Sequence, residues 1–171
     1  YHLLAGTRKL YPSDRVQLGN TGIEMSRMAM GTGTSGYGGS SNQTRQLGIR
    51  GLSDLLRAGF DEGINFWDSA DGYGSHPHLK EALKKIDRDN VVILTKTTSK
   101  NYQDVKNDLD RFRKEIGTDY LDIVLLHAVT DPSWNKNMSG AMEALSEAKE
   151  EGIIRAHGIS CHSLGALETA A

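Results

Sequence analysis

Four titratable side chains of this sequence stand at, or just beyond, places where buried strands should end. Asp68, Lys96 and His127 each directly follow a short apolar run, and Tyr73 follows Asp68 closely along the chain. A further apolar run is followed by Ser160. In parallel α/β folds the reactive groups gather at the carboxyl ends of the strands. We therefore expect these side chains to share one rim of the fold.

A phenol, an ammonium, a carboxylate and an imidazole on one rim suit the reduction of a carbonyl group. The carbonyl oxygen must receive a proton, and a free tyrosine, with a pKa of ~10, donates slowly near neutrality. An ammonium near Tyr73 would favour the phenolate and lower that pKa, and Lys96 is the obvious cation. Asp68 can pair with Lys96, and His127 can donate a hydrogen bond to the substrate oxygen. The structural alternative is a buried ion pair, a satisfied core histidine and a tyrosine that only packs.

The segments that must position these residues alternate between apolar runs and helical patterns. Strands are expected at 28–30, 64–67, 91–94, 123–126 and 154–159. Helices are expected over 44–61, 78–86, 102–116 and 138–150, and a last one begins near Ser163. The apolar stripe of the first helix contains Leu52, Leu55, Leu56 and Phe60. Because the runs lack clean alternation, they predict a parallel sheet buried on both faces, with right-handed crossovers.

The fold class follows from this order. Residues 16–28 predict a short β-hairpin with its turn at 20–22, and 36–41 predict a flexible loop. After the hairpin, equivalent strand ends recur about every 30 residues, which is one βα unit per repeat. The chain is therefore α/β with five βα units, the last stopping within its helix. Residues 1–15 are expected to be a lead-in and 16–171 a single domain.

Four ordered motifs of this chain resemble the aldo-keto reductase family. They are GINFWDSADGYG (63–74), ILTKT (93–97), DYLDIVLLH (119–127) and GIIRAHGIS (152–160). The resemblance extends over nearly the whole chain from residue 16. It implies a parallel (β/α)8 TIM barrel that binds NADPH, of which this chain holds about the first five units. It also implies a catalytic tetrad, which falls on Asp68, Tyr73, Lys96 and His127, and a small-molecule carbonyl substrate.

The same resemblance suggests where a cofactor binds. The segment MGTGT (30–34) is similar to the family's glycine-threonine segment, with Gly31 allowing close backbone approach and Thr32 offering a hydroxyl to the nicotinamide ribose. Asp68 lies beside it. Ser160 matches a position that contacts the nicotinamide carboxamide. The next family residue is usually asparagine, and Cys161, a poor hydrogen-bonding substitute, stands there instead.

Composition argues against several other classes of function. The net charge is −2 over 171 residues, which provides no broad footprint for nucleic acid or an anionic membrane. The single cysteine excludes an intramolecular disulfide, and no apolar run reaches the ~20 residues that span a bilayer. A cytoplasmic protein is expected. Because the chain begins at Tyr1 without methionine, a trimmed N-terminus, and with it an exported form, stays open.

Two histidine groups and two tryptophans have simpler interpretations than a site. His76 and His78 flank a proline at the start of a helix and have no third ligand at metal spacing. His157, Cys161 and His162 would be divided between strand faces, so no zinc site is expected. Trp67 is expected in the core. Trp134 is expected either to line the substrate pocket or to pack at the surface.

The length of the chain leaves several possibilities open. An eight-unit barrel takes roughly 200 residues at least and ~250 typically. Three interpretations follow. The chain is an incomplete reductase, or it is a fragment whose barrel is completed by a C-terminal remainder or a second chain, or it is a shortened relative without turnover. A regulatory, nucleotide-sensing protein on the same scaffold is the alternative to an enzyme. A metal-dependent hydrolase would need clustered ligands that the lysine and tyrosine do not provide.

Overall fold

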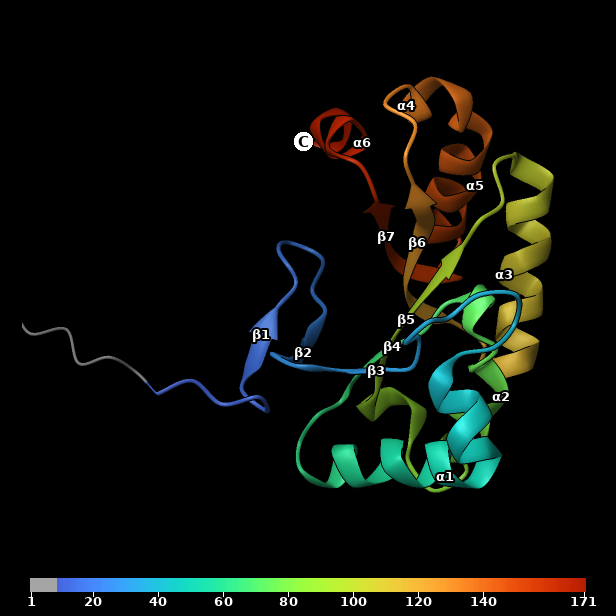
Figure 1. Cartoon of the computed structure of the whole chain (residues 1–171). Coiled ribbons are helices and arrows are strands. Elements are labelled where there is room, and N and C mark those ends of the chain that lie inside the picture. Colours follow the sequence, from blue (N-terminus) through green and yellow to red (C-terminus); the bar gives the residue numbers. More distant parts are fainter. Residues whose placement is uncertain (1–8) are drawn as a thin grey trace, which may run out of the picture.

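A parallel sheet with helices along one face forms the body of the molecule (Figure 1). The computed structural model describes residues 9–171, so residues 1–8 of the expected lead-in over 1–15 lie outside the described residues. The sheet has the order β3-β4-β5-β6-β7, so each strand pairs in parallel with the next along the chain. Its strands are β3 (Ala29–Gly31), β4 (Phe66–Asp68), β5 (Val92–Thr97), β6 (Leu121–Val129) and β7 (Ile154–Cys161).

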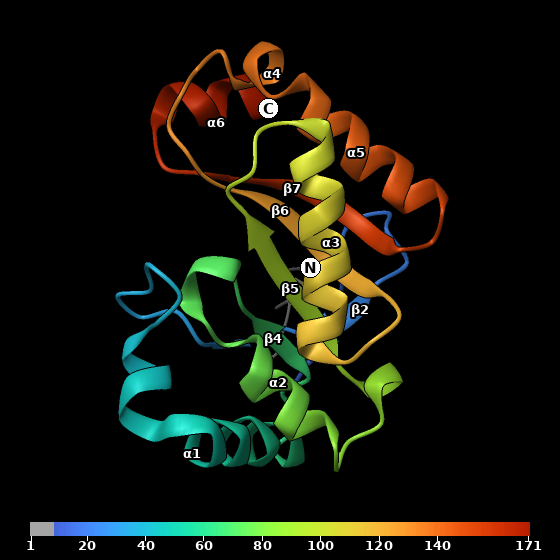
Figure 2. The ribbon, with the colours of Figure 1, turned by 90° about the vertical axis from the view of Figure 1, so that its right-hand side faces the viewer.

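Helices connect successive strands and lie side by side on the outer face (Figure 2). They are α1 (Asn42–Asp61), α2 (His76–Leu83), α3 (Tyr102–Ile116), α4 (Trp134–Asn137), α5 (Ser139–Glu150) and α6 (Leu164–Ala170). Two 3-10 turns, η1 (Asp71–Tyr73) and η2 (Arg88–Asn90), flank α2. The predicted order of elements and the α/β class are confirmed, and the fold is that of part of a TIM barrel.

Helix α3 shows how the sequence defines one element. The Asn101 side chain caps its first turn by accepting from the Asp104 amide, and Gly117 ends it in the left-handed conformation, with φ 77°. Between these caps, Val105, Leu109 and Phe112 recur at helical spacing and are buried. On one flank of this helix, Arg111 contacts Asp71 in the turn that bears Tyr73.

Helix α1 differs from its prediction in two respects. Gly48, with φ 61° and ψ −175°, interrupts it near its start, so an initial turn is set at an angle to the rest. Leu52 and Leu56 are buried, but Leu55, predicted in the same stripe, is 45% exposed. The strongest contacts of α1 are with α2, and Leu55 lies outside the buried stripe.

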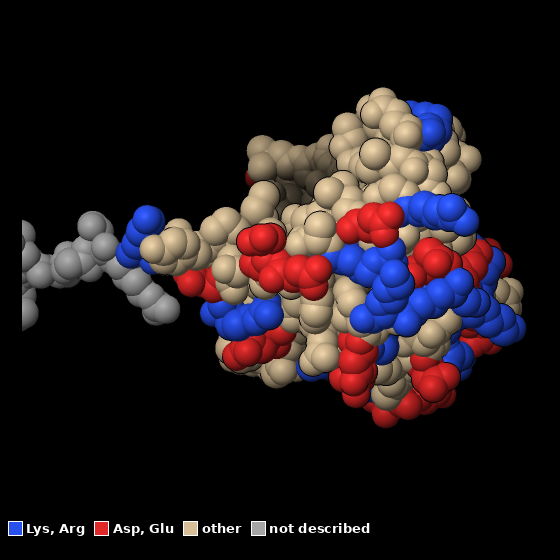
Figure 3. All heavy atoms as spheres, turned by 90° about the horizontal axis from the view of Figure 1, so that it is seen from below, with Lys and Arg blue, Asp and Glu red and all other residues tan. Residues whose placement is uncertain are grey.

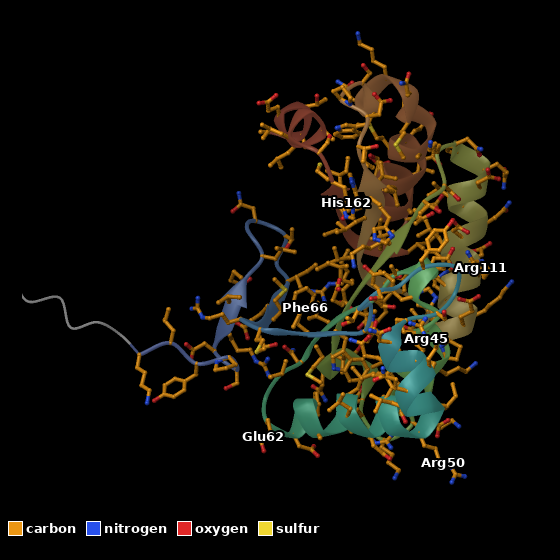
Figure 4. The ribbon with its side chains drawn as sticks, viewed as in Figure 1. Arg45, Arg50, Glu62, Phe66, Arg111 and His162 are labelled. Atoms are coloured by element: carbon orange, nitrogen blue, oxygen red, sulfur yellow. The ribbon has the colours of Figure 1, made fainter. Side chains whose placement is uncertain are left out.

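The inner face of the sheet is less covered than predicted. The hairpin of β1 (Arg15–Gln17) and β2 (Glu24–Ser26) lies on this side and buries Ile23 completely against the sheet. Figure 4 shows Phe66 on the hairpin side and Arg111 on the helix side. Between the hairpin and the sheet, an open apolar groove of about 550 Å³ runs along Phe66, Leu94 and Leu125. The sheet is therefore buried fully on its helical face only, because five strands curve without closing.

The surface carries both signs of charge. Basic and acidic side chains are interspersed on the face shown in Figure 3. Within residues 9–171, no helix is both long and apolar enough to cross a membrane.

Candidate active site

The four strand-end residues come together at one rim of the sheet. Asp68 ends β4, Lys96 lies near the end of β5, and His127 lies near the end of β6. Tyr73 ends the turn η1 that follows β4. The Lys96 Nζ lies 5.0 Å from the centre of the Tyr73 ring, and the Tyr73 Oη lies 3.5 Å from His127 Nε2. The structure thus brings together all four residues that the sequence singled out.

Lys96 and Asp68 form the most tightly bonded pair of this group. Lys96 Nζ donates to Asp68 Oδ1 at 2.5 Å and to the carbonyl of Ser69 at 2.9 Å. The lysine side chain is only 9% exposed and the aspartate side chain 33%. A buried side chain of this type needs an anionic partner, and Asp68 provides it beneath the tyrosine.

The pKa of Tyr73 moves in the direction opposite to the prediction. Burial raises this pKa above its ordinary value of 10.0, and the carboxylate of Asp68 raises it further. The expected lowering by Lys96 does not outweigh these two effects. The ammonium lies over the ring face, 5.0 Å from its centre, and its two hydrogen bonds go to Asp68 and Ser69. Tyr73 in this structure is consequently a protonated phenol, which can donate its proton.

His127 faces Tyr73 edge-on and is neutral near pH 7. Burial lowers its pKa from 6.5, and the positive charge of Lys96 adds to the effect. Its ring meets that of Tyr73 at 80°, with centroids 5.6 Å apart, and His162 lies on its other side at 6.2 Å. A neutral imidazole keeps one N–H to donate, and Nε2 is the nitrogen nearest the phenol.

An irregularity in β6 directs His127 toward the rim. The register against β7 shifts between Leu126 and Val129, and Ala128 has a positive φ of 55°. A bulge of this kind turns a side chain relative to the regular pleat, and such bulges are common beside active sites. This bulge was not predictable from sequence, because alanine is not a residue that favours the left-handed region.

Two glycines form the seat of the Tyr73 ring. A Cβ on Gly33 would lie 2.1 Å from Tyr73 Cε2, and a Cβ on Gly36 would lie 2.3 Å from Tyr73 Cδ1. The loop after β3, predicted only as flexible, therefore packs directly on the candidate proton donor at Gly36. Neither glycine was predicted as a site residue, although the high number of glycines in the loop after the first strand was a signal.

Gly33→Ala should displace the ring of Tyr73. Because the added methyl cannot share the space of the ring, we expect a loss of activity of about 10²-fold, the effect of moving a reacting group by about 1 Å. Steady-state rates with a reducible aldehyde measure it. Gly72→Ala is the control, since nothing lies within 4 Å of a Cβ there. Equal activity in the two variants would show that contact with Gly33 does not position the Tyr73 ring.

The candidate cofactor residues divide into accessible and inaccessible ones. Gly31 is exposed at the end of β3, with open space where a Cβ would stand, and Ser160 and Cys161 are half-buried near the end of β7. Thr32 corrects the prediction. It is completely buried, and its hydroxyl donates to the Asp68 carbonyl at 2.9 Å and bonds Ser75 Oγ at 2.8 Å. Thr32 ties β3 to β4 in this structure and presents no hydroxyl to a ligand.

A cavity of about 800 Å³ opens beside the tyrosine and the histidine. Tyr37, Asp71, Arg111 and His162 also line it. Trp134 does not, which corrects the expectation that it lines the pocket or packs at the surface. It is 8% exposed, and its Nε1 donates to the carbonyl of Ala166 at 3.1 Å, so it belongs to the core. Trp67 is fully buried in the core as predicted.

His76, outside the rim, has structural partners. His76 bonds Glu115 at 2.7 Å and Thr95 at 2.8 Å, and Pro77 occupies the first turn of α2 as predicted. Within residues 9–171 the one group spaced to hold a metal is Asp71, His76 and Glu115, so His76 lies near two further possible ligands, contrary to the prediction. Arg111 pairs with Asp71 and Glu115, so the negative charge of this group is already compensated.

The buried histidines make the stability of the fold sensitive to acid. Burial lowers the pKa values of His76, His78 and His127 below 6.5, whereas the unfolded chain keeps the ordinary value of about 6.5. Between those values the unfolded state binds more protons, so the free energy of unfolding should be full above about pH 6.5 and fall as the pH drops below it. Urea unfolding at pH 7.5 and pH 5.5 measures this change. An unchanged free energy of unfolding would contradict it.

Comparison with known proteins places this arrangement in a family. A sequence profile of the aldo/keto reductase family matches residues 27–171. The chain is 30% identical over 169 residues to the NADH-specific methylglyoxal reductase of Escherichia coli (strain K12), covering 84% of this chain and 51% of that protein. The chain spans about half the length of the curated relatives it matches.

Solved structures show the same likeness. One from Pseudomonas aeruginosa, described as an aldo-keto reductase, has a TM-score of 0.76 and 26% identity, covering 90% of this chain and 62% of its own. An aldo-keto reductase from Klebsiella pneumoniae in complex with NADPH has a TM-score of 0.67 and 25% identity, covering 86% of this chain and 49% of its own.

Proposed function

Because this chain belongs to the aldo/keto reductase family, we propose that it carries the acid-base half of a carbonyl reductase that uses NADPH. Its substrate would be the carbonyl of an aldehyde or ketone. The observation that supports this most strongly is the convergence of Asp68, Tyr73, Lys96 and His127 beside one cavity. A purely structural ion pair would explain Asp68 and Lys96. It would not explain a half-buried phenol and a neutral imidazole facing each other over the same lysine.

The residues at the rim fit the nicotinamide end of such a cofactor. The backbone at Gly31 is open to close approach, and Ser160 is half-buried near the end of β7. Cys161 packs partly against the core and offers only a weak hydrogen bond. The bound cofactor would supply the hydride. The relatives differ in preference, since one is named NADH-specific and another was solved with NADPH, so both forms belong in the test.

Each of the four residues has a task in the proposed reaction. A bound nicotinamide would supply a hydride, which carries the two electrons of the reduction, to the carbonyl carbon, and the carbonyl oxygen would gain the proton of the Tyr73 hydroxyl. Lys96 lies close enough to stabilise the phenolate left behind, which is reprotonated from water. Asp68 keeps Lys96 in place, and His127 donates a hydrogen bond to the substrate oxygen as charge develops on it.

The test is an assay of the protein at its natural length. Reduced nicotinamide absorbance is followed with NADPH or NADH and a panel of aldehydes and ketones, and cofactor binding is measured separately by calorimetry. Carbonyl-dependent loss of absorbance supports the proposal. Tight cofactor binding without turnover of any carbonyl would contradict it and favour a nucleotide-sensing protein.

A further inference from the structure

The turn that carries Tyr73 is fixed to helix α3 by one arginine. Arg111 reaches from α3 to Asp71, the first residue of η1, and its Nη1 and Nη2 donate to the two carboxylate oxygens at 2.7 and 2.9 Å. Tyr73 ends the same three-residue turn. A two-point contact between a planar guanidinium and a carboxylate fixes orientation as well as distance. A short turn held in this way cannot rotate without breaking both bonds.

The same arginine is linked to the strand end that carries Lys96. Arg111 Nη2 also donates to Asp108 Oδ1 at 2.7 Å. The other oxygen of Asp108 accepts from Thr97 Oγ1 at 2.5 Å and from Ser99 Oγ at 2.7 Å. Thr97 directly follows Lys96. Arg111 and Asp108 therefore join the tyrosine-bearing turn and the end of β5 to one capped helix.

The charges around Arg111 indicate an internal role. Its guanidinium also donates to Glu115 at 3.1 Å, so it contacts three carboxylates with one positive charge. Bonding to Asp71, more than to the other two, raises its pKa above the ordinary value. Although Arg111 lines the cavity, its charge is more than compensated, so the cavity wall there does not attract an anionic substrate. The arrangement suits holding a turn better than binding a ligand.

We propose that Arg111 is a positioning residue, which sets the Tyr73 hydroxyl against Lys96 and His127 through Asp71 and Asp108. The inference rests on the proposed carbonyl reduction. Proton donation depends steeply on placement, and an error of about 1 Å can lower a rate about 10²-fold. The glycine seat restrains the ring from one side, and Arg111 restrains the backbone of the turn from the other.

Arg111→Met tests the proposal, with Arg113→Met as the matched control. Arg113 lies on the same helix and pairs with Asp110, as Arg111 pairs with Asp108, but it contacts no residue of η1. Arg111→Met should lower kcat about 10- to 100-fold, within the range expected for a misplaced reacting group, while KM and cofactor affinity change little. Arg113→Met should leave kcat near the wild-type value. Arg111→Lys should restore only part of the rate, because an ammonium cannot make the paired contact.

Two further measurements separate positioning from simple destabilisation. In a Tyr73→Phe background, Arg111→Met should lower the residual rate no further, because its effect acts through the lost hydroxyl. The ring signals of Tyr73 in NMR spectra should move in Arg111→Met and stay in place in Arg113→Met. If the wild-type protein reduces carbonyls and the two arginine variants have equal rates, positioning is wrong and the proposed function stands. If no carbonyl is reduced, the proposed function fails, and the NMR shifts alone decide whether Arg111 sets the position of Tyr73.

Discussion

Tyr73→Phe should abolish carbonyl reduction while leaving cofactor binding almost unchanged. The substitution removes one oxygen and keeps the ring between Gly33 and Gly36, so the seat and the fold should persist. A positioned general acid typically contributes 10²–10⁴-fold, and we expect kcat to fall by about that factor. Single-turnover rates with a saturating aldehyde measure the loss, and titration calorimetry measures the affinity for NADPH.

The control for this variant is another tyrosine on the rim of the same cavity. Tyr37 is 89% exposed, and Tyr37→Phe should change kcat by no more than a few-fold. Full activity of Tyr73→Phe would exclude the phenol as the proton donor. A parallel loss of cofactor affinity would instead indicate that the substitution disturbs the rim as a whole.

Lys96→Met should produce the second large loss. Removing the ammonium leaves Asp68 as an unbalanced negative charge near Tyr73, and that charge already raises the pKa of the phenol. The phenolate formed by proton donation would then lack its stabilising cation. We expect kcat to fall about 10²–10³-fold, as on losing one preorganised electrostatic group. Cofactor-dependent aldehyde reduction across a pH series measures the change.

Stability provides an independent check on the same variant. One-sided removal of a fully buried pair costs about 3–5 kcal/mol, but Asp68 remains one-third exposed, so we expect about 1–3 kcal/mol. The control is Lys84→Met, which removes the exposed pair with Glu81 and should cost less than about 1 kcal/mol. Equal free energies of unfolding for the two variants would mean that the Lys96 pair is not the buried link described above.

Patterns that depend only on spacing were predictable from the sequence. Asp68, Lys96 and His127 could be found because the end of a buried strand is recognisable in sequence, and parallel strands end at one rim. The limits of α3 were predicted because its apolar stripe and the glycine after it are local signals. The burial of Trp67 followed from its place inside an apolar run.

Features that depend on three-dimensional closeness were not predictable. The seat at Gly33 and Gly36 depends on where a loop meets a side chain far along the chain. Thr32 was predicted to face a ligand, but its hydroxyl finds partners in the next strand and in Ser75. The pKa of Tyr73 was predicted to fall because an ammonium is near. The direction of the shift is set instead by the burial of the phenol and by the carboxylate of Asp68.

In the loop after β3, the residues that hold the proposed acid Tyr73 are different from the residue that projects into the mouth of the cavity. Gly33 and Gly36 touch the Tyr73 ring and tolerate no side chain, whereas Tyr37 projects from the same loop with almost its whole side chain in solvent. Substitutions at Tyr37 can therefore reshape the mouth of the cavity without moving the proton donor. Directed evolution of this scaffold toward new carbonyl compounds should begin at that position and leave its glycine neighbours untouched.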